Sequence, residues 1–171
     1  MNLEPERVLP TLPVFTTSTQ VTDWTGLSVG GMVKDSLVLD LARLSEMHQE
    51  TLEEDFHCTH GWVVPELLWE GVALKTILEL ASPLPDSSYV AITAGDYQMG
   101  FSLYDVYTSK VLVALKLNGE TLTPDHGYPC RLIASGKLCH YSVKWIESIE
   151  ITNTPSEDTG IAIVASRDDQ T

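Results

Sequence analysis

Short β-rich segments recur along this chain, and turn-forming residues close each of them. Residues 27–40 hold two such segments around a polar turn at 34–36. Residues 89–93 and 110–117 are rich in β-branched and aliphatic side chains, and an Asn-Gly pair, a strong hairpin signal, follows the second. Residues 148–152 predict a last strand. A chain of many short strands separated by turns folds into sheets, so the pattern predicts a mostly-β architecture.

Two segments carry helical signals instead. Residues 40–47 predict a short helix, and Leu74, Ile77, Leu78 and Ala81 recur at the spacing of one helix face. Since strands remain in the majority, the fold class is predicted to be α+β, as a single mostly-β domain with a few short helices. The 171 residues, 43% of them hydrophobic, suffice for one buried core.

The region around Cys58 is predicted to combine a strand with a loop. Residues 51–57 alternate well enough to predict a strand that leads into Cys58. Gly61, Pro65 and Gly71 then predict a loop, because glycine and proline interrupt regular structure.

The formal net charge of −14 excludes classes of partner. Such an acidic chain is unsuited to nucleic acid or to an anionic membrane surface. No apolar run reaches the roughly 18 residues of a membrane span, and the N-terminus lacks the pattern of a signal peptide. We therefore expect a cytoplasmic location by default, or a periplasmic one if a signal peptide has been removed.

One segment departs from this acidic composition. Residues 126–146 contain no Asp or Glu, yet they hold His126, Arg131 and Lys144. These side chains could bind a phosphate, with Arg131 offering a bidentate fork. The alternative is that Arg131 and Lys144 pair with surface carboxylates, each pair contributing about 0–1 kcal/mol.

Cys58 lies in a second segment with functional residues, between His57 and His60. Alternate side chains of an extended chain share a face, so Cys58 and His60 could bind one metal ion. A buried free thiol is the simpler alternative. The three cysteines show no C-x-x-C spacing, so a disulfide framework is not expected. A zinc site is a further alternative, and its ligands would be Cys58, His60, Cys130 and either Cys139 or His140.

Blocks of sequence in a fixed order carry a family resemblance. The blocks are residues 24–31, 37–44, 58–74, 111–119, 126–131 (HGYPCR) and 142–146 (SVKWI). Together they resemble the molybdopterin-binding domain of the sulfite oxidase family. Trp62, and the lack of an arginine cluster after Cys58, make the chain more similar to the bacterial methionine-sulfoxide reductase branch.

The resemblance implies a division of the chain into three parts. Residues 24–152 would form the molybdopterin-binding domain. Residues 1–23, which contain three prolines, would be an extended N-terminal arm, and residues 153–171 a tail that packs on the domain or leaves it.

The resemblance also implies a cofactor site. Cys58 would be the protein ligand of molybdenum and, with Tyr97, a catalytic residue. Soft sulfur ligands suit this metal. The pterin phosphate would lie against the basic segment. The candidate cofactor-binding residues are His57, His60, His126, Arg131, Ser142 and Lys144.

The function implied by the resemblance is oxygen-atom transfer by an oxidoreductase. The substrate would be a small and neutral sulfur or nitrogen compound, because the acidic run 53–55 before Cys58 would repel sulfite. Since the sequence contains no C-x-x-C-H haem motif, electrons would come from a separate redox partner protein. The alternative is a cofactor-free binding module with the same fold. It is suggested by residues 14–19, which lack the Asn or Arg followed by His that relatives bring to the pterin.

Overall fold

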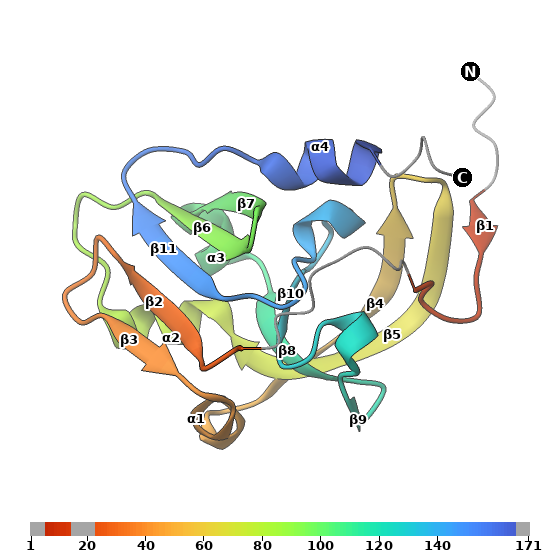
Figure 1. The fold of residues 1–171 in the computed structure, drawn as a ribbon, viewed down its shortest axis with the longest axis horizontal. Helices are drawn as coiled ribbons and strands as arrows, with labels where there is room; N and C mark the ends of the chain where they lie inside the picture. Colours follow the sequence, from red (N-terminus) through yellow and green to blue (C-terminus); the bar gives the residue numbers. More distant parts are fainter. Residues whose placement is uncertain (1–5, 15–22, 167–171) are drawn as a thin grey trace.

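The computed structural model describes residues 6–14 and 23–166, whose strands form two sheets (Figure 1). The strands of the first sheet are β1 (Arg7–Val8), β4 (Glu50–Cys58), β5 (Trp62–Ala73), β8 (Val111–Leu117), β9 (Glu120–Thr121) and β10 (Arg131–Ala134). Those of the second are β2 (Leu27–Gly31), β3 (Leu37–Leu39), β6 (Tyr89–Ala94), β7 (Tyr97–Ser102) and β11 (Ser148–Thr152). The first sheet has the order β1-β5-β8-β10, with β4 paired to β5 and β9 to β8, and the second has the order β3-β2-β11-β6-β7.

Short helices connect or cover the sheets. They are α1 (Leu41–Glu46), α2 (Leu74–Ala81), α3 (Leu103–Thr108), α4 (Thr159–Ser166) and the 3-10 turns η1 (Pro124–His126) and η2 (Cys139–Tyr141). Helix α1 begins where the Asp40 side chain accepts a hydrogen bond from the Arg43 amide at 2.7 Å. Helix α2 buries the apolar face that its spacing predicts. The predicted α+β class is confirmed.

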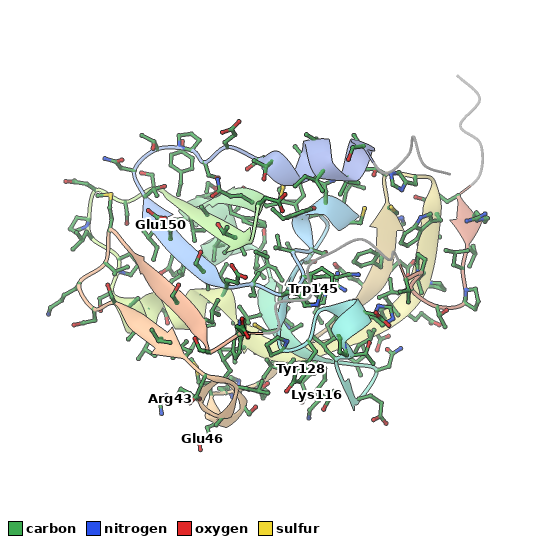
Figure 2. All side chains as sticks on the ribbon, viewed as in Figure 1. Arg43, Glu46, Lys116, Tyr128, Trp145 and Glu150 are labelled. Carbon is green, nitrogen blue, oxygen red and sulfur yellow. The ribbon has the colours of Figure 1, made fainter. Side chains whose placement is uncertain are left out.

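The core lies on both faces of the first sheet. Along β8, Val111, Val113 and Leu115 pack into a cluster shared with the second sheet, whereas Leu112 and Ala114 face a separate cluster on the other side. This alternation follows from the period of two of a strand. Exposed charged side chains surround the core, including Arg43 and Glu46 on α1 and Glu150 on β11 (Figure 2).

The loop predicted from Gly61, Pro65 and Gly71 is wrong, because these residues lie before or within the long strand β5. Pro65 lies opposite a shift in the register of the β4–β5 pair, and Gly71 adjoins a second shift in the β5–β8 pair. At Gly71 an added Cβ would collide with the Val113 carbonyl oxygen. The two residues therefore mark irregularities inside a strand, where proline and glycine are tolerated.

The described part of the N-terminal arm adds an edge to the first sheet. Strand β1 pairs in parallel with β5, through hydrogen bonds from Arg7 N to Gly61 O and from Leu9 N to Val63 O, both 2.8 Å. Residues 15–19, for which missing cofactor contacts were predicted, lie outside the described residues. Within the described ranges, no helix is both long and apolar enough to span a membrane.

Candidate functional site

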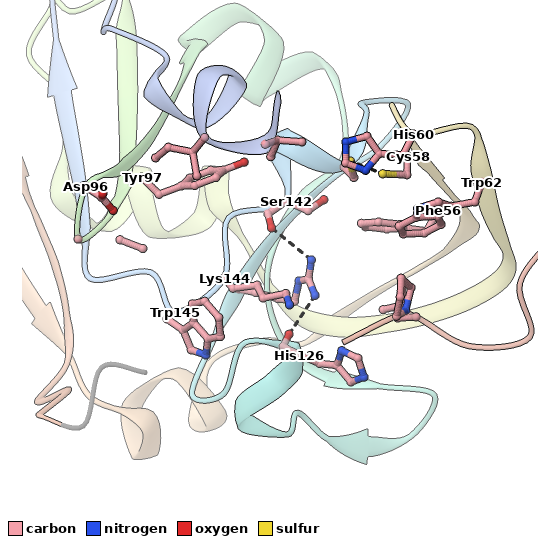
Figure 3. A pocket seen from close by; sticks show the side chains of 18 of the residues that line it. Phe56, Cys58, His60, Trp62, Asp96, Tyr97, His126, Ser142, Lys144 and Trp145 are labelled. Carbon is pink, nitrogen blue, oxygen red and sulfur yellow. Dashed lines mark hydrogen bonds between the residues drawn. The ribbon is translucent and has the colours of Figure 1, made fainter. Parts of the chain in front are cut away.

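A cavity of about 430 Å³ lies where the end of β4 and the start of β5 face the β6–β7 turn, the η1 and η2 segments and α4 (Figure 3). Figure 3 shows Cys58 and His60 on one side of it and Asp96 and Tyr97 on the other. The predicted site residues that line the cavity are Cys58, His60, Tyr97, His126, Arg131, Ser142 and Lys144. Its volume is in the range of small-molecule and cofactor pockets.

His57 does not line this cavity. It is exposed, and its Nδ1 lies 3.0 Å from a carboxylate oxygen of Glu6. Because consecutive residues of a strand face opposite sides, the same geometry that turns Cys58 into the cavity turns His57 away from it. The structure thus gives no support to the cofactor contact predicted for His57.

A second thiol accompanies Cys58. The Cys58 Sγ lies at the end of β4, 3.0 Å from the Sγ of Cys139, the first residue of η2. The hydrogen bond between the two thiols, together with burial, raises the pKa of Cys58, and the same bond lowers the pKa of Cys139. The cavity therefore holds two soft ligand atoms side by side.

The third cysteine lies apart from this pair. Cys130 is fully buried between the two sheets, and its thiol donates a hydrogen bond to the Ile146 carbonyl at 3.9 Å. Burial also raises the pKa of Cys130. Among the described residues no group of three or more His, Cys, Asp or Glu side chains could hold a metal ion. The four-ligand zinc site proposed as an alternative is not assembled.

Arg131 is a buried cation in the cavity wall. It is 2% exposed, and its guanidinium donates to the carbonyls of His126 at 2.9 Å and Ser142 at 3.2 Å. Its Cζ lies 4.9 Å from the centre of the Trp69 ring. Among the described residues Arg131 has no carboxylate partner, and its buried Nε has no hydrogen-bond partner. Burial lowers the pKa of Arg131 to about 10.

Two further basic side chains surround Arg131. Lys144 pairs with Arg131 through a backbone bridge, and its Nζ donates to the Asp125 carbonyl at 2.7 Å. Burial, and then the charges of Lys144 and Arg131, lower the pKa of His126. Gly127 permits this packing, since its φ is +111° and an added Cβ would lie 2.9 Å from that of Arg131. An anion would offset the concentration of positive charge here.

Tyr97 and Ser142 complete the predicted set. The Tyr97 hydroxyl donates to the His140 carbonyl at 2.6 Å, which joins the start of β7 to η2. Ser142 follows η2, and its carbonyl is one of the acceptors of Arg131. Both line the cavity.

Sequence reasoning missed several wall residues. The apolar wall includes Phe56 and Trp62 beside Cys58, and Ile163 and Val164 from α4. The acidic residues in the wall are Asp96 and Glu147, rather than the run 53–55 that was expected to repel sulfite. Trp62 entered the sequence analysis only as part of the family resemblance, and the other wall residues belong to segments that tertiary packing alone brings together. For Phe56 the available signal was the alternation of β4, which turns it to the same side as Cys58.

Comparisons with known proteins identify a family and several relatives that this chain resembles. The family described as "Oxidoreductase molybdopterin binding domain" matches residues 12–159. The uncharacterized oxidoreductase YuiH of Bacillus subtilis is 30% identical over 133 residues, which are 77% of this chain and 67% of that protein. The NADPH nitrate reductase of Beauveria bassiana is 35% identical over 99 residues, which are 53% of this chain and 11% of the reductase.

A solved structure shares the fold. The sulfane dehydrogenase SoxCD from Paracoccus pantotrophus superposes with a TM-score of 0.73 at 23% sequence identity, over 82% of this chain and 41% of that one. The present chain therefore spans two thirds of YuiH and a smaller share of the other two proteins.

Proposed function

Because this chain belongs to the oxidoreductase molybdopterin-binding domain family, we propose that its cavity binds the molybdenum cofactor and acts on a small, neutral sulfur- or nitrogen-containing substrate. The observation that carries the proposal is the presence of the Cys58 thiol and the uncompensated Arg131 cation in the walls of one cavity. A soft metal with an anionic tail requires both kinds of group.

The residues present fit the cofactor at both of its ends. Cys58 offers a sulfur ligand of the kind that soft metals prefer. Arg131 has a buried Nε without a partner among the described residues, and the Nδ1 of His126 is in the same condition. Together with Lys144 these groups would hold the phosphate, since charge-assisted hydrogen bonds to a buried anion are strong.

The protein's own contribution is to orient the cofactor and to enclose the space in which the substrate binds. When bound, the cofactor supplies two-electron oxygen-atom transfer. Cys58 fixes one end, and the apolar side chains of Phe56, Trp62, Ile163 and Val164 exclude water from the space beside it. To donate a hydrogen bond to the substrate, the Tyr97 hydroxyl would have to give up its bond to the His140 carbonyl.

The acidic side chains in the cavity wall favour a neutral substrate. Asp96 is exposed in the β6–β7 turn, and Glu147 accepts a hydrogen bond from the Gly95 amide at 3.2 Å. Negative charge at this position raises the free energy of an approaching sulfite or nitrate. A separate redox partner protein would deliver or remove the electrons.

Metal content tests the proposed cofactor. We expect protein from a host with intact cofactor synthesis to contain molybdenum near one atom per chain, measured by mass spectrometry of the metal. Cys58→Ser should remove it, whereas Cys130→Ala should retain it because Cys130 does not line the cavity. Metal-free wild-type protein from that host would favour the cofactor-free binding module instead.

Turnover with an artificial electron donor tests the substrate class. We expect the loaded protein to reduce a neutral sulfoxide or amine oxide faster than nitrate, by about tenfold or more, the factor given by roughly 1.4 kcal/mol of repulsion. Asp96→Asn should narrow this difference. A preference for nitrate, or no effect of Asp96→Asn, would contradict the role of the acidic wall.

A further inference from the structure

We propose that Cys58 and Cys139 form a reversible disulfide inside the cavity, which withdraws the Cys58 sulfur from metal binding. Their sulfur atoms are 3.0 Å apart. A disulfide bond is about 2.05 Å long, so the two atoms need to approach by roughly 1 Å. The hydrogen bond between the thiols therefore already holds them near the position in which they would be joined.

The surrounding backbone can accommodate this approach. Cys58 ends β4 and precedes a turn in which Thr59 is exposed and Gly61 has open space around its Cα. Cys139 begins the single turn η2, directly after the exposed residues 136–138. Both cysteines thus lie at the ends of elements beside exposed turns, and a small shift does not require the core to repack.

The burial of the three thiols determines which of them an oxidant can reach. Cys58 and Cys139 both line the cavity, and Cys139 is the more exposed of the two, so an oxidant meets the Cys139 sulfur first. Cys130 is 0% exposed and hydrogen-bonded to the Ile146 carbonyl. Only one pairing of the three thiols is therefore open to oxidation in the folded protein.

The reaction balances with a disulfide as the oxidant. One thiolate of the pair attacks a sulfur of oxidised glutathione, forms a mixed disulfide and releases one glutathione thiolate. The second protein thiolate attacks the protein sulfur of the mixed disulfide, closes the Cys58–Cys139 bond and releases the second glutathione. The pair loses two electrons, glutathione disulfide gains them, and the two thiol protons pass to solvent.

The effect on metal binding rests on the proposed function, whereas formation of the bond does not. In the disulfide form, Cys58 has no thiolate to offer as a ligand. Reduction by a dithiol restores it. Cys58 would thus be unavailable to the metal under oxidising conditions and available under reducing conditions.

Peptide mapping of the cofactor-free full chain tests the bond. The folded protein is incubated with oxidised glutathione. It is then unfolded in a denaturant that contains N-ethylmaleimide, which labels free thiols, and digested with trypsin. We expect the peptide of residues 44–75, which contains Cys58, to be joined to the peptide of residues 138–144, which contains Cys139. The mass of the intact chain should be lower by two hydrogen atoms. The peptide of residues 117–131 should carry the label on Cys130. Dithiothreitol should reverse the link.

Two variants serve as matched controls. Cys130→Ala should still form the link, whereas Cys139→Ser should stop at a mixed disulfide with glutathione on Cys58 or remain free. Both thiols found labelled and unlinked in the wild type, with the fold intact by circular dichroism, would overturn the disulfide and leave the cofactor proposal untouched.

Protection by the cofactor separates the two proposals. In molybdenum-loaded protein, Cys58 would be occupied, and we expect the rate of disulfide formation to fall at least about tenfold. Equal rates with and without molybdenum would refute Cys58 as the ligand, while the disulfide itself would stand.

Discussion

At the scale of single residues, burial distinguishes between roles of a side chain that the composition leaves open. Arg131 could have been one of many surface cations paired with a carboxylate. The structure instead buries it against Trp69 with carbonyl oxygens as its acceptors. A buried cation without a counter-charge is costly unless an anion accompanies it, so Arg131 indicates a ligand rather than a surface ion pair.

His126 is expected to make the proposed anion site dependent on pH. Burial and the charges of Lys144 and Arg131 lower the pKa of His126 in the folded state, while the nearby Asp125 opposes them. The neutral ring is therefore favoured on folding. This contribution to stability is complete above the unfolded pKa of about 6.5 and is lost as the pH falls below it. A bound dianion would favour the protonated ring and reverse that loss.

We therefore expect millimolar sulfate to stabilise the cofactor-free protein more at about pH 5.5 than at about pH 7.5. The difference in the free energy of unfolding should be roughly 1 kcal/mol, which corresponds to a rise of under one unit in the pKa of His126. The measurement is the shift of the thermal midpoint at constant ionic strength. His126→Gln should keep the stabilisation at neutral pH and lose its pH dependence. Identical pH profiles for the two proteins would refute the assignment.

At the scale of elements, glycine and proline have a different role from the one that sequence reasoning gives them. Pro65 and Gly71 lie within β5, at or beside register shifts, so this strand continues through residues that usually end one. The close approach of β5 to β8 at Gly71 leaves no room for a side chain. Trp62 of this strand lines the cavity, and the Trp69 ring of the same strand lies against the Arg131 guanidinium.

Gly71→Ala should therefore destabilise the fold, by about 1–3 kcal/mol as for overpacking of a core. Gly30→Ala is the matched control, because Gly30 lies in a strand where an added Cβ meets only the Ser36 hydroxyl at 3.9 Å. Its effect should stay within about 0.5 kcal/mol. Urea denaturation measures both, and equal midpoints for the two variants would show that β5 can move away from β8.

At the scale of the whole molecule, the sequence predicts individual strands and helices better than it predicts the tertiary contacts between them. Strand alternation and the turn at Asn118-Gly119 predict β8 and its hairpin with β9, because these signals are local. The contact between Cys58 and Cys139 joins positions 81 residues apart and depends on how β4 meets η2. No spacing rule predicts such a contact, so Cys139 entered the sequence analysis only as one of several zinc ligands.

The position of α4 has a consequence for how related domains could diverge. The family match ends at residue 159, where this eight-residue helix begins, and Ile163 and Val164 of the helix still face the cavity. A change in the sequence of this helix would alter the cavity wall at Ile163 and Val164, while β4, which holds Cys58, stays unchanged. Exchanging only these eight residues between homologues should therefore alter which compounds enter the cavity.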